Sequence, residues 1–84
     1  MEKIIFSKHA KQQMSERGAL EKEVIEAIVN GETFSARHSR TAYRRNFQYN
    51  DKWGNKFYHI KQVVPIVKKE NSKIIVITVF AFYF

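Results

Sequence analysis

The order of hydrophobic and polar positions divides the chain into a helical N-terminal third and a β-rich remainder. Lys3–Phe6 has the pattern of a short strand. Ser7 follows as a candidate N-cap and Gly18 as a stop, which predicts a helix from Lys8 to Arg17. A second apolar stripe predicts a helix from about Glu21 to Asn30. The stripe consists of Leu20, Val24, Ala27 and Ile28.

From Glu32 onward, β-branched and aromatic residues alternate with turn signals, which predicts strands. The segments 50–55 and 69–72 are typical of hairpin connections, so the strands should pair antiparallel. Pro65 has no N–H group to donate, and we therefore expect a sheet edge or a bulge there. The predicted strands are Thr33–Arg37, Thr41–Tyr49, Lys56–Val67 and Lys73–Phe82.

Helices grouped before strands predict an α+β fold, with both helices packed on one face of a four-stranded antiparallel sheet. Lys3–Phe6 would make a fifth strand if it joined the sheet. The segment Ile74–Phe82 is apolar on both faces, which is typical of a central strand. Arg44 and Arg45 point to opposite faces of their strand, and we expect the uncovered face to be open and basic. Without a linker or repeat, residues 1–84 are predicted to form a single domain.

Composition excludes several classes of small protein. The 84 residues include no cysteine, so disulfide frameworks, thiolate metal sites and cysteine nucleophiles are excluded. The longest apolar run, residues 74–84, is shorter than the about 20 residues that a spanning helix needs, and we expect no membrane contact. No N-terminal segment resembles a signal peptide.

The charge is basic and unevenly distributed. Fifteen basic residues against eight acidic ones give a net charge of +7, and the excess lies entirely after residue 31. Residues 35–50 carry four arginines, no acid and three interleaved aromatic side chains. This pattern favours a nucleic acid as partner, with an acidic protein as the alternative. The expected RNA-binding residues are Arg37, Arg40, Arg45, Tyr43 and Lys61.

The candidate chemistry requires neither a metal nor a cofactor. The three histidines are not spaced as metal ligands, and acidic residues do not cluster. Histidine can remove the proton of a ribose 2′-hydroxyl, and arginine can stabilise the charge that grows on phosphorus. His9, Gln13 and Arg17 form one stripe of the first helix. Packing in the first turn for His9, and an interaction with the helix dipole for Arg17, are the simpler alternatives.

The first 31 residues and the last strand resemble the bacterial DUF4258 family, which is grouped with the RelE-like ribonuclease toxins of the BECR superfamily. The resemblance is carried by Phe6-Ser7-Lys8-His9-Ala10, by Met14, by Glu16-Arg17-Gly18, by Asn30-Gly31 and by Ile75–Val79. It implies a small cytotoxic ribonuclease that acts without metal and is neutralised by a cognate antitoxin or immunity protein. Its place of action would be the cytoplasm, either of its own cell or of a target cell. This chain has Gln13 where the pattern usually has arginine, and it lacks the usual Ser or Thr before the second helix.

Together these observations give our first hypothesis, an endoribonuclease that cleaves single-stranded tRNA or mRNA to a 2′,3′-cyclic phosphate and a 5′-hydroxyl. A non-catalytic module that binds RNA or a protein partner on the same scaffold is the second hypothesis. A domain that docks only an acidic protein against residues 37–45 is the third. The expected catalytic residues are His9 as acid or base, Arg17 and Arg44 as cations, Thr78 as a phosphate ligand and His59 as the complementary acid or base.

Overall fold

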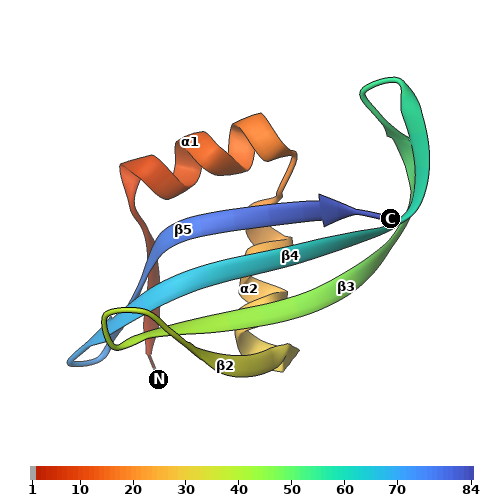
Figure 1. The fold of residues 1–84 in the computed structure, drawn as a ribbon. Helices are drawn as coiled ribbons and strands as arrows, with labels where there is room; N and C mark the ends of the chain where they lie inside the picture. The colour runs from red at the N-terminus through yellow and green to blue at the C-terminus, as the bar shows by residue number, and fades with distance from the viewer. Residues whose placement is uncertain (1) are drawn as a thin grey trace.

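Two helices and five strands make up the protein, seen here in a computed structural model that describes residues 2–84 (Figure 1). The elements are β1 (Lys3–Phe6), α1 (Lys8–Arg17), α2 (Glu21–Asn30), β2 (Glu32–Ala36), β3 (Arg40–Trp53), β4 (Lys56–Glu70) and β5 (Lys73–Tyr83). The predicted α+β class is confirmed, because both helices precede the four strands β2–β5 and pack against their sheet.

The strands form one mixed sheet in the order β1-β5-β4-β3-β2. β1 joins as the fifth strand and runs parallel to β5, whereas the other neighbouring pairs are antiparallel. The middle strand is β4. β5 has neighbours on both sides over residues 73–76 and forms the sheet edge beyond Val76, so the predicted central position of Ile74–Phe82 holds only for the start of that strand. β5 is apolar on both faces for a different reason: one face packs on the core, and the other carries hydrophobic side chains into solvent.

Pro65 lies in the central strand β4, so the predicted edge position is wrong. The sheet tolerates it because the β3–β4 pairing is interrupted there, between the pairs Ala42–Ile66 and Arg45–Val63. The alternative prediction, a bulge, is met one residue further along, where the register against β5 shifts between Ile66 and Val67.

Both helices have the predicted bounds, and their ends have clear physical causes. The Ser7 hydroxyl accepts a hydrogen bond from the Ala10 N–H at 3.0 Å and caps α1. Gly18 ends α1 in the left-handed conformation, with φ of 74°. α2 has no side-chain cap on Leu20; instead the Glu23 carboxylate accepts the Leu20 N–H at 3.0 Å.

The β3–β4 hairpin is longer than predicted. We expected a connection over residues 50–55, but β3 continues to Trp53 and β4 begins at Lys56, and the two-stranded ribbon projects beyond the rest of the sheet (Figure 1). Aromatic packing ties the ribbon back to the sheet, since the ring of Trp53, the last residue of β3 before the turn, stacks on Tyr83 with centroids 4.9 Å apart. Aromatic residues there stabilise an extended ribbon where turn propensity predicted a loop.

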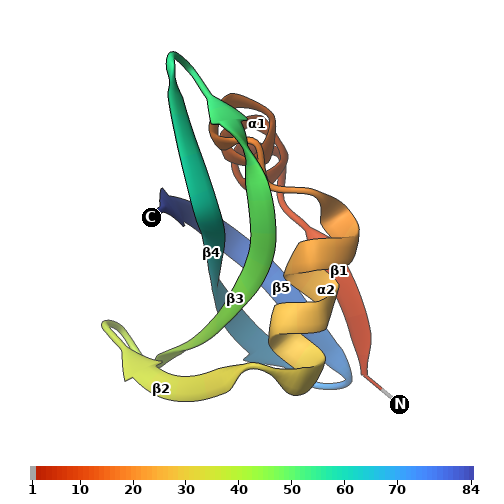
Figure 2. The same cartoon turned by 90° about the vertical axis from the view of Figure 1, so that its right-hand side faces the viewer.

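The helices leave one face of the sheet uncovered. α2 packs across β3 and β4, and α1 lies along β5 (Figures 1 and 2). The core between them is aliphatic, with Val24, Val63, Val67, Val76 and Val79 almost completely buried. Within residues 2–84, no helix combines the length and the apolar character needed to cross a membrane.

Candidate nucleic-acid interface

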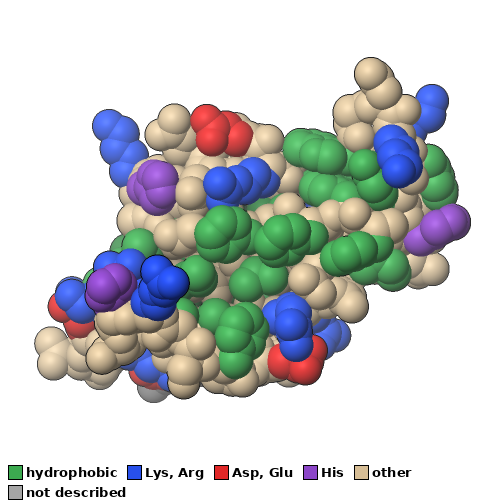
Figure 3. All heavy atoms as spheres, in the orientation of Figure 1, with side chains coloured by type: hydrophobic (Ala, Val, Ile, Leu, Met, Phe, Trp, Pro, Cys, Tyr) green, Lys and Arg blue, Asp and Glu red, His purple; other side chains and the backbone are tan. Residues whose placement is uncertain are grey.

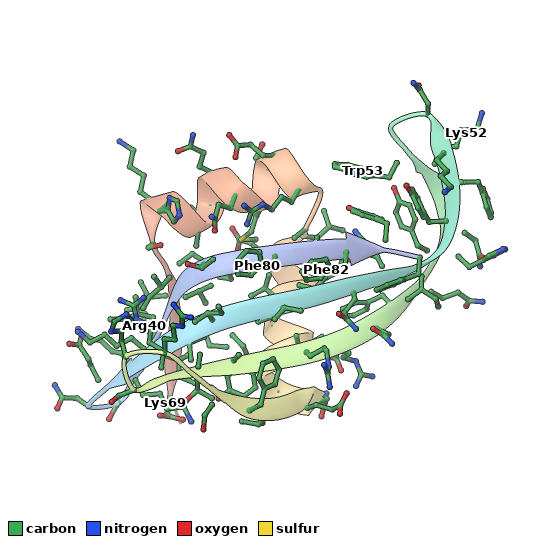
Figure 4. The ribbon with its side chains drawn as sticks, in the orientation of Figure 1. Arg40, Lys52, Trp53, Lys69, Phe80 and Phe82 are labelled. Atoms are coloured by element: carbon green, nitrogen blue, oxygen red, sulfur yellow. The ribbon has the colours of Figure 1, made fainter. Side chains whose placement is uncertain are left out.

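The open face, defined here as the sheet face opposite α2, has a hydrophobic centre. Cross-strand pairing places Val64 beside Phe80, Ile66 beside Thr78 and Gln62 beside Phe82. Phe80 and Phe82 lie at alternate positions of β5 and form what we call the aromatic strip, with centroids 6.2 Å apart and ring planes within 17° (Figure 4). Phe82 is 46% exposed, so the strip offers a flat aromatic surface to solvent.

Cations surround this centre instead of filling it. In Figure 3, hydrophobic side chains run along the middle of the face toward the viewer, and basic side chains lie at its margins. The prediction of an open face is confirmed, but its expected basic character applies only to the rim. Alternation along β3 explains the difference, because Tyr43, Arg45 and Phe47 share the face that the helices cover.

Arg17 connects α1 to the aromatic strip. Its Nη1 donates a hydrogen bond to the Val79 carbonyl oxygen at 2.7 Å, and its Cζ lies 5.0 Å from the centroid of the Phe80 ring. The guanidinium therefore holds the helix to β5 and also covers part of Phe80. It lies at the margin of the open face, where the resemblance implied a cation, but it already has a protein partner.

Arg44 lies on the open face, as its alternation with Arg45 predicted. Its Nε and Nη2 donate to the two Glu32 carboxylate oxygens, each at 3.4 Å, and its Cζ lies 5.4 Å from the Phe34 ring centroid. Both partners of this ion pair are well exposed. Such a pair contributes about 0–1 kcal/mol, so a phosphate can compete with Glu32 for the guanidinium.

A hollow of about 390 Å³ lies at the end of the open face near the β2–β3 turn. It brings together three predicted site residues, namely Arg37, Arg40 and Thr78, with Phe80 of the aromatic strip. His38, which the sequence did not single out for a site, also lines it. The remaining lining residues are Ala36 and Ile66.

The predicted catalytic histidines do not meet. His9 is exposed in the first turn of α1, on the stripe whose other members contact Val79, and it does not line the hollow. His59 is exposed on the β4 side of the projecting ribbon, where its Nδ1 lies 3.1 Å from Asn50 Oδ1. The ribbon begins where β5 ends, whereas Thr78 lies in the middle of that strand. A common site for His9, His59 and Arg44 is therefore not formed.

Three of the predicted RNA-binding residues are on the helix-covered side. Tyr43 is buried in the core. Arg45 is half-exposed and binds α2, through the Asn30 carbonyl oxygen at 3.3 Å and the Glu26 carboxylate at 3.6 Å. Lys61 is only 5% exposed, and its Nζ donates to Gly18 O and Glu23 Oε1. Its burial does not allow Lys61 to touch RNA.

Gln13 accepts a structural hydrogen bond, which explains why this chain has no arginine at the position where the DUF4258 pattern usually has one. Its Oε1 accepts the Val79 N–H at 3.0 Å, on the edge of β5 that β1 no longer reaches. Together with Arg17, which binds the Val79 carbonyl, it satisfies both backbone groups of this residue. An arginine has no acceptor and cannot replace this contact.

We therefore expect Gln13→Arg to lower the free energy of unfolding by about 1–3 kcal/mol, because the Val79 N–H loses its acceptor. Urea unfolding followed by circular dichroism measures the change. Gln13→Glu is the matched control, since it keeps an acceptor oxygen and should remain near wild-type stability. Equal stability of the arginine and glutamate variants would contradict this role of Gln13.

The Tyr83 hydroxyl has a structural role at the end of α1. Burial raises the pKa of Tyr83 to about 12, so its hydroxyl remains protonated and donates to the Arg17 carbonyl oxygen at 2.7 Å.

Nowhere in the part of the chain that the structure describes do three metal-ligating side chains come together.

Three residues that matter here were missed by sequence reasoning, namely Phe80, Phe82 and His38. The i, i+2 spacing of Phe80 and Phe82 would have marked a shared face, but strand 73–82 is apolar throughout and hides its alternation. His38 sits in a turn with no motif around it.

Comparison with known proteins adds one match. The family model described as "Domain of unknown function (DUF4258)" matches residues 6–81. Neither the curated proteins nor the solved structures contain a match to the chain.

Proposed function

From the premise that this chain belongs to the DUF4258 family, a family of unknown function, we propose that it is a metal-independent endoribonuclease that binds single-stranded RNA on its open face. The observation that carries the proposal is the aromatic strip bordered by cations, with Arg17 over Phe80 and the arginines of the β2–β3 turn at one end. Unpaired bases stack on exposed aromatic rings, and guanidinium groups bind the phosphates between them.

The hydrophobic centre favours a single strand over a duplex. Stacking on Phe80 and Phe82 requires free base faces, and a duplex offers only its grooves and backbone. The amides of Gln62 and Asn46, which share a hydrogen bond of 2.9 Å beside the strip, can exchange it for hydrogen bonds with base edges. The net charge of +7 adds a general attraction that weakens with salt.

The proposed cleavage uses the 2′-hydroxyl of the RNA itself. The 2′-oxygen bonds to phosphorus while the bond from phosphorus to O5′ breaks, which leaves a 2′,3′-cyclic phosphate and a 5′-hydroxyl. A base takes the proton of the 2′-hydroxyl, and an acid gives a proton to O5′. Imidazoles suit both roles near neutral pH, and guanidinium groups at the rim suit the charge on phosphorus.

The decisive experiment incubates the protein with a labelled, mixed-sequence single-stranded RNA in EDTA. We expect cleavage with cyclic phosphate ends, and no cleavage of the matching DNA. The double variant Phe80→Ala/Phe82→Ala should weaken RNA binding by about 1–3 kcal/mol for each base that loses its ring. Val29→Ala, which removes an exposed apolar side chain of α2, is the control and should bind like wild type. Cleavage that stops in EDTA would contradict the proposal.

A non-catalytic RNA-binding module is the second candidate, and the engagement of Arg17 and Arg44 with protein groups favours it. It predicts the same loss of affinity in the double variant but no RNA products at any protein concentration. In either case, a protein that neutralises this one would have to cover the aromatic strip.

A further inference from the structure

The hollow beside the β2–β3 turn has the size and chemistry of a nucleotide site. It measures about 390 Å³ and opens onto the aromatic strip through Phe80. Its lining includes Phe80 and Ile66, which offer an apolar surface to a base, together with Arg37 and Arg40. Figure 4 labels Phe80 on β5 and Arg40 at the start of β3. Ligand sites commonly combine an apolar wall with a few placed polar groups.

Its charge is positive and uncompensated. Arg37, His38 and Arg40 all line the hollow, and no acidic residue does. Throughout residues 2–84, none of the three forms an ion pair, whereas Arg44, Arg45 and Lys61 each have a carboxylate partner. Two free guanidinium groups on one short turn are suited to the oxygens of a single phosphate, and the Thr78 hydroxyl supplies a further hydrogen-bonding group.

The turn itself is conformationally costly. His38 and Ser39 have φ values of 60° and 59°, and the turn is closed by the Arg40 N–H donating to the Arg37 carbonyl oxygen at 3.3 Å. Consecutive positive φ angles in a hairpin turn are normally occupied by Asn-Gly, which the sequence does not use. A histidine with positive φ at the edge of a cationic hollow of nucleotide size points to a functional choice of residue.

We propose that this hollow binds one nucleotide of the RNA, with its phosphate on Arg37 and Arg40 and its base against Phe80. We further propose that His38 acts there as acid or base, by taking the proton of the 2′-hydroxyl or by giving a proton to O5′. The second part rests on the proposed function. This role of His38 places the reacting phosphate in the hollow and not beside the polar residues of α1. The reason is that His38 is the histidine that shares a cavity with free arginines and with Thr78.

Nucleotide binding is tested without any cleavage, by titrating uridine 3′-monophosphate and uridine separately into the wild-type protein and following amide NMR shifts. We expect the monophosphate to bind at least tenfold more tightly than the nucleoside, with shifts at Ala36–Arg40 and Thr78. Arg40→Gln should weaken monophosphate binding roughly tenfold. Lys22→Gln, which removes an exposed cation from α2, should leave it unchanged. Equal binding of both probes, or an unaffected Arg40 variant, would overturn the site.

The role of His38 is tested by comparing His38→Gln, His9→Gln and His59→Gln in the RNA cleavage assay. We expect His38→Gln to lose about 10²–10⁴-fold in cleavage rate while its RNA affinity changes little, and to lose more than either other variant. A greater loss in His9→Gln, or complete absence of cleavage in wild type, overturns this role. Intact cleavage in the Arg40 and His38 variants, together with its loss in Phe80→Ala/Phe82→Ala, would reject the hollow while the proposed function stands.

Discussion

Replacing Lys61 by methionine is expected to lower the free energy of unfolding by about 3–5 kcal/mol, a large part of the stability of so small a domain. The Lys61 Nζ lies 2.9 Å from Glu23 Oε1 and 2.8 Å from the Gly18 carbonyl oxygen, and both side chains of the ion pair are almost excluded from solvent. Methionine matches the length of the lysine stem but leaves the Glu23 carboxylate poorly solvated without its cation. Urea unfolding measures the loss.

Two controls separate burial from charge. Lys52→Met removes a cation from the exposed tip of the projecting ribbon and should change stability by less than about 0.5 kcal/mol (Figure 4). The double variant Lys61→Met/Glu23→Gln should recover part of the loss, because no buried charge remains unpaired. A single variant as stable as wild type would show that water reaches Glu23 freely.

Lys61 also shows why part of the site escaped prediction. A lysine in a basic, aromatic-rich chain is expected to be on the surface, and strand 56–67 is apolar on both faces around residues 63–66, so its alternation does not show which face is covered. The partner that buries Lys61, Glu23, lies 38 positions away on α2. Only the packing of α2 on β4 reveals the pair.

The sequence predicted correctly those features that depend on interactions between residues close together in the chain. Ser7 and Gly18 fix the ends of α1 through their own caps, so the helix bounds followed from the sequence. The opposite faces of Arg44 and Arg45 followed equally directly from strand alternation. The association of Arg37, Arg40 and Thr78 depends instead on the curl of the β2–β3 turn toward β5, which is a tertiary property.

The parallel pairing of β1 could not be predicted from the sequence either, because it too depends on tertiary structure. Lys3–Phe6 carries a strand pattern, but its partner is the last strand of the chain, with Ile4 opposite Ile74. This pairing aligns α1 with β5, and the edge of β5 beyond Val76 is then satisfied by Ser7, Gln13 and Arg17. A helix that serves as the missing neighbour of a strand leaves little freedom to its polar stripe, and this accounts for the contacts of Gln13 and Arg17 with Val79.

Gly18→Ala is the second change with a large expected effect, a loss of about 2–5 kcal/mol in the free energy of unfolding. Gly18 has φ of 74°, and a Cβ added there would lie 2.6 Å from Trp53 Cζ3 and 2.7 Å from the Tyr83 hydroxyl oxygen. The substitution combines a left-handed alanine with a clash against two rings that stack on each other. Thermal unfolding with a urea series measures the loss.

Gly54→Ala is the matched control, because Gly54 has φ of 67° at the ribbon turn and no atom within 4 Å of an added Cβ. It should lose only about 1–2 kcal/mol, the cost of the conformation itself. The difference between the two alanine variants therefore isolates the packing of Trp53 and Tyr83 on the α1–α2 junction. Since this packing lies at the end of β5 away from Thr78, Gly18→Ala should still bind uridine 3′-monophosphate at temperatures where it remains folded. Loss of nucleotide binding in folded Gly18→Ala would mean that the junction and the hollow are coupled through β5.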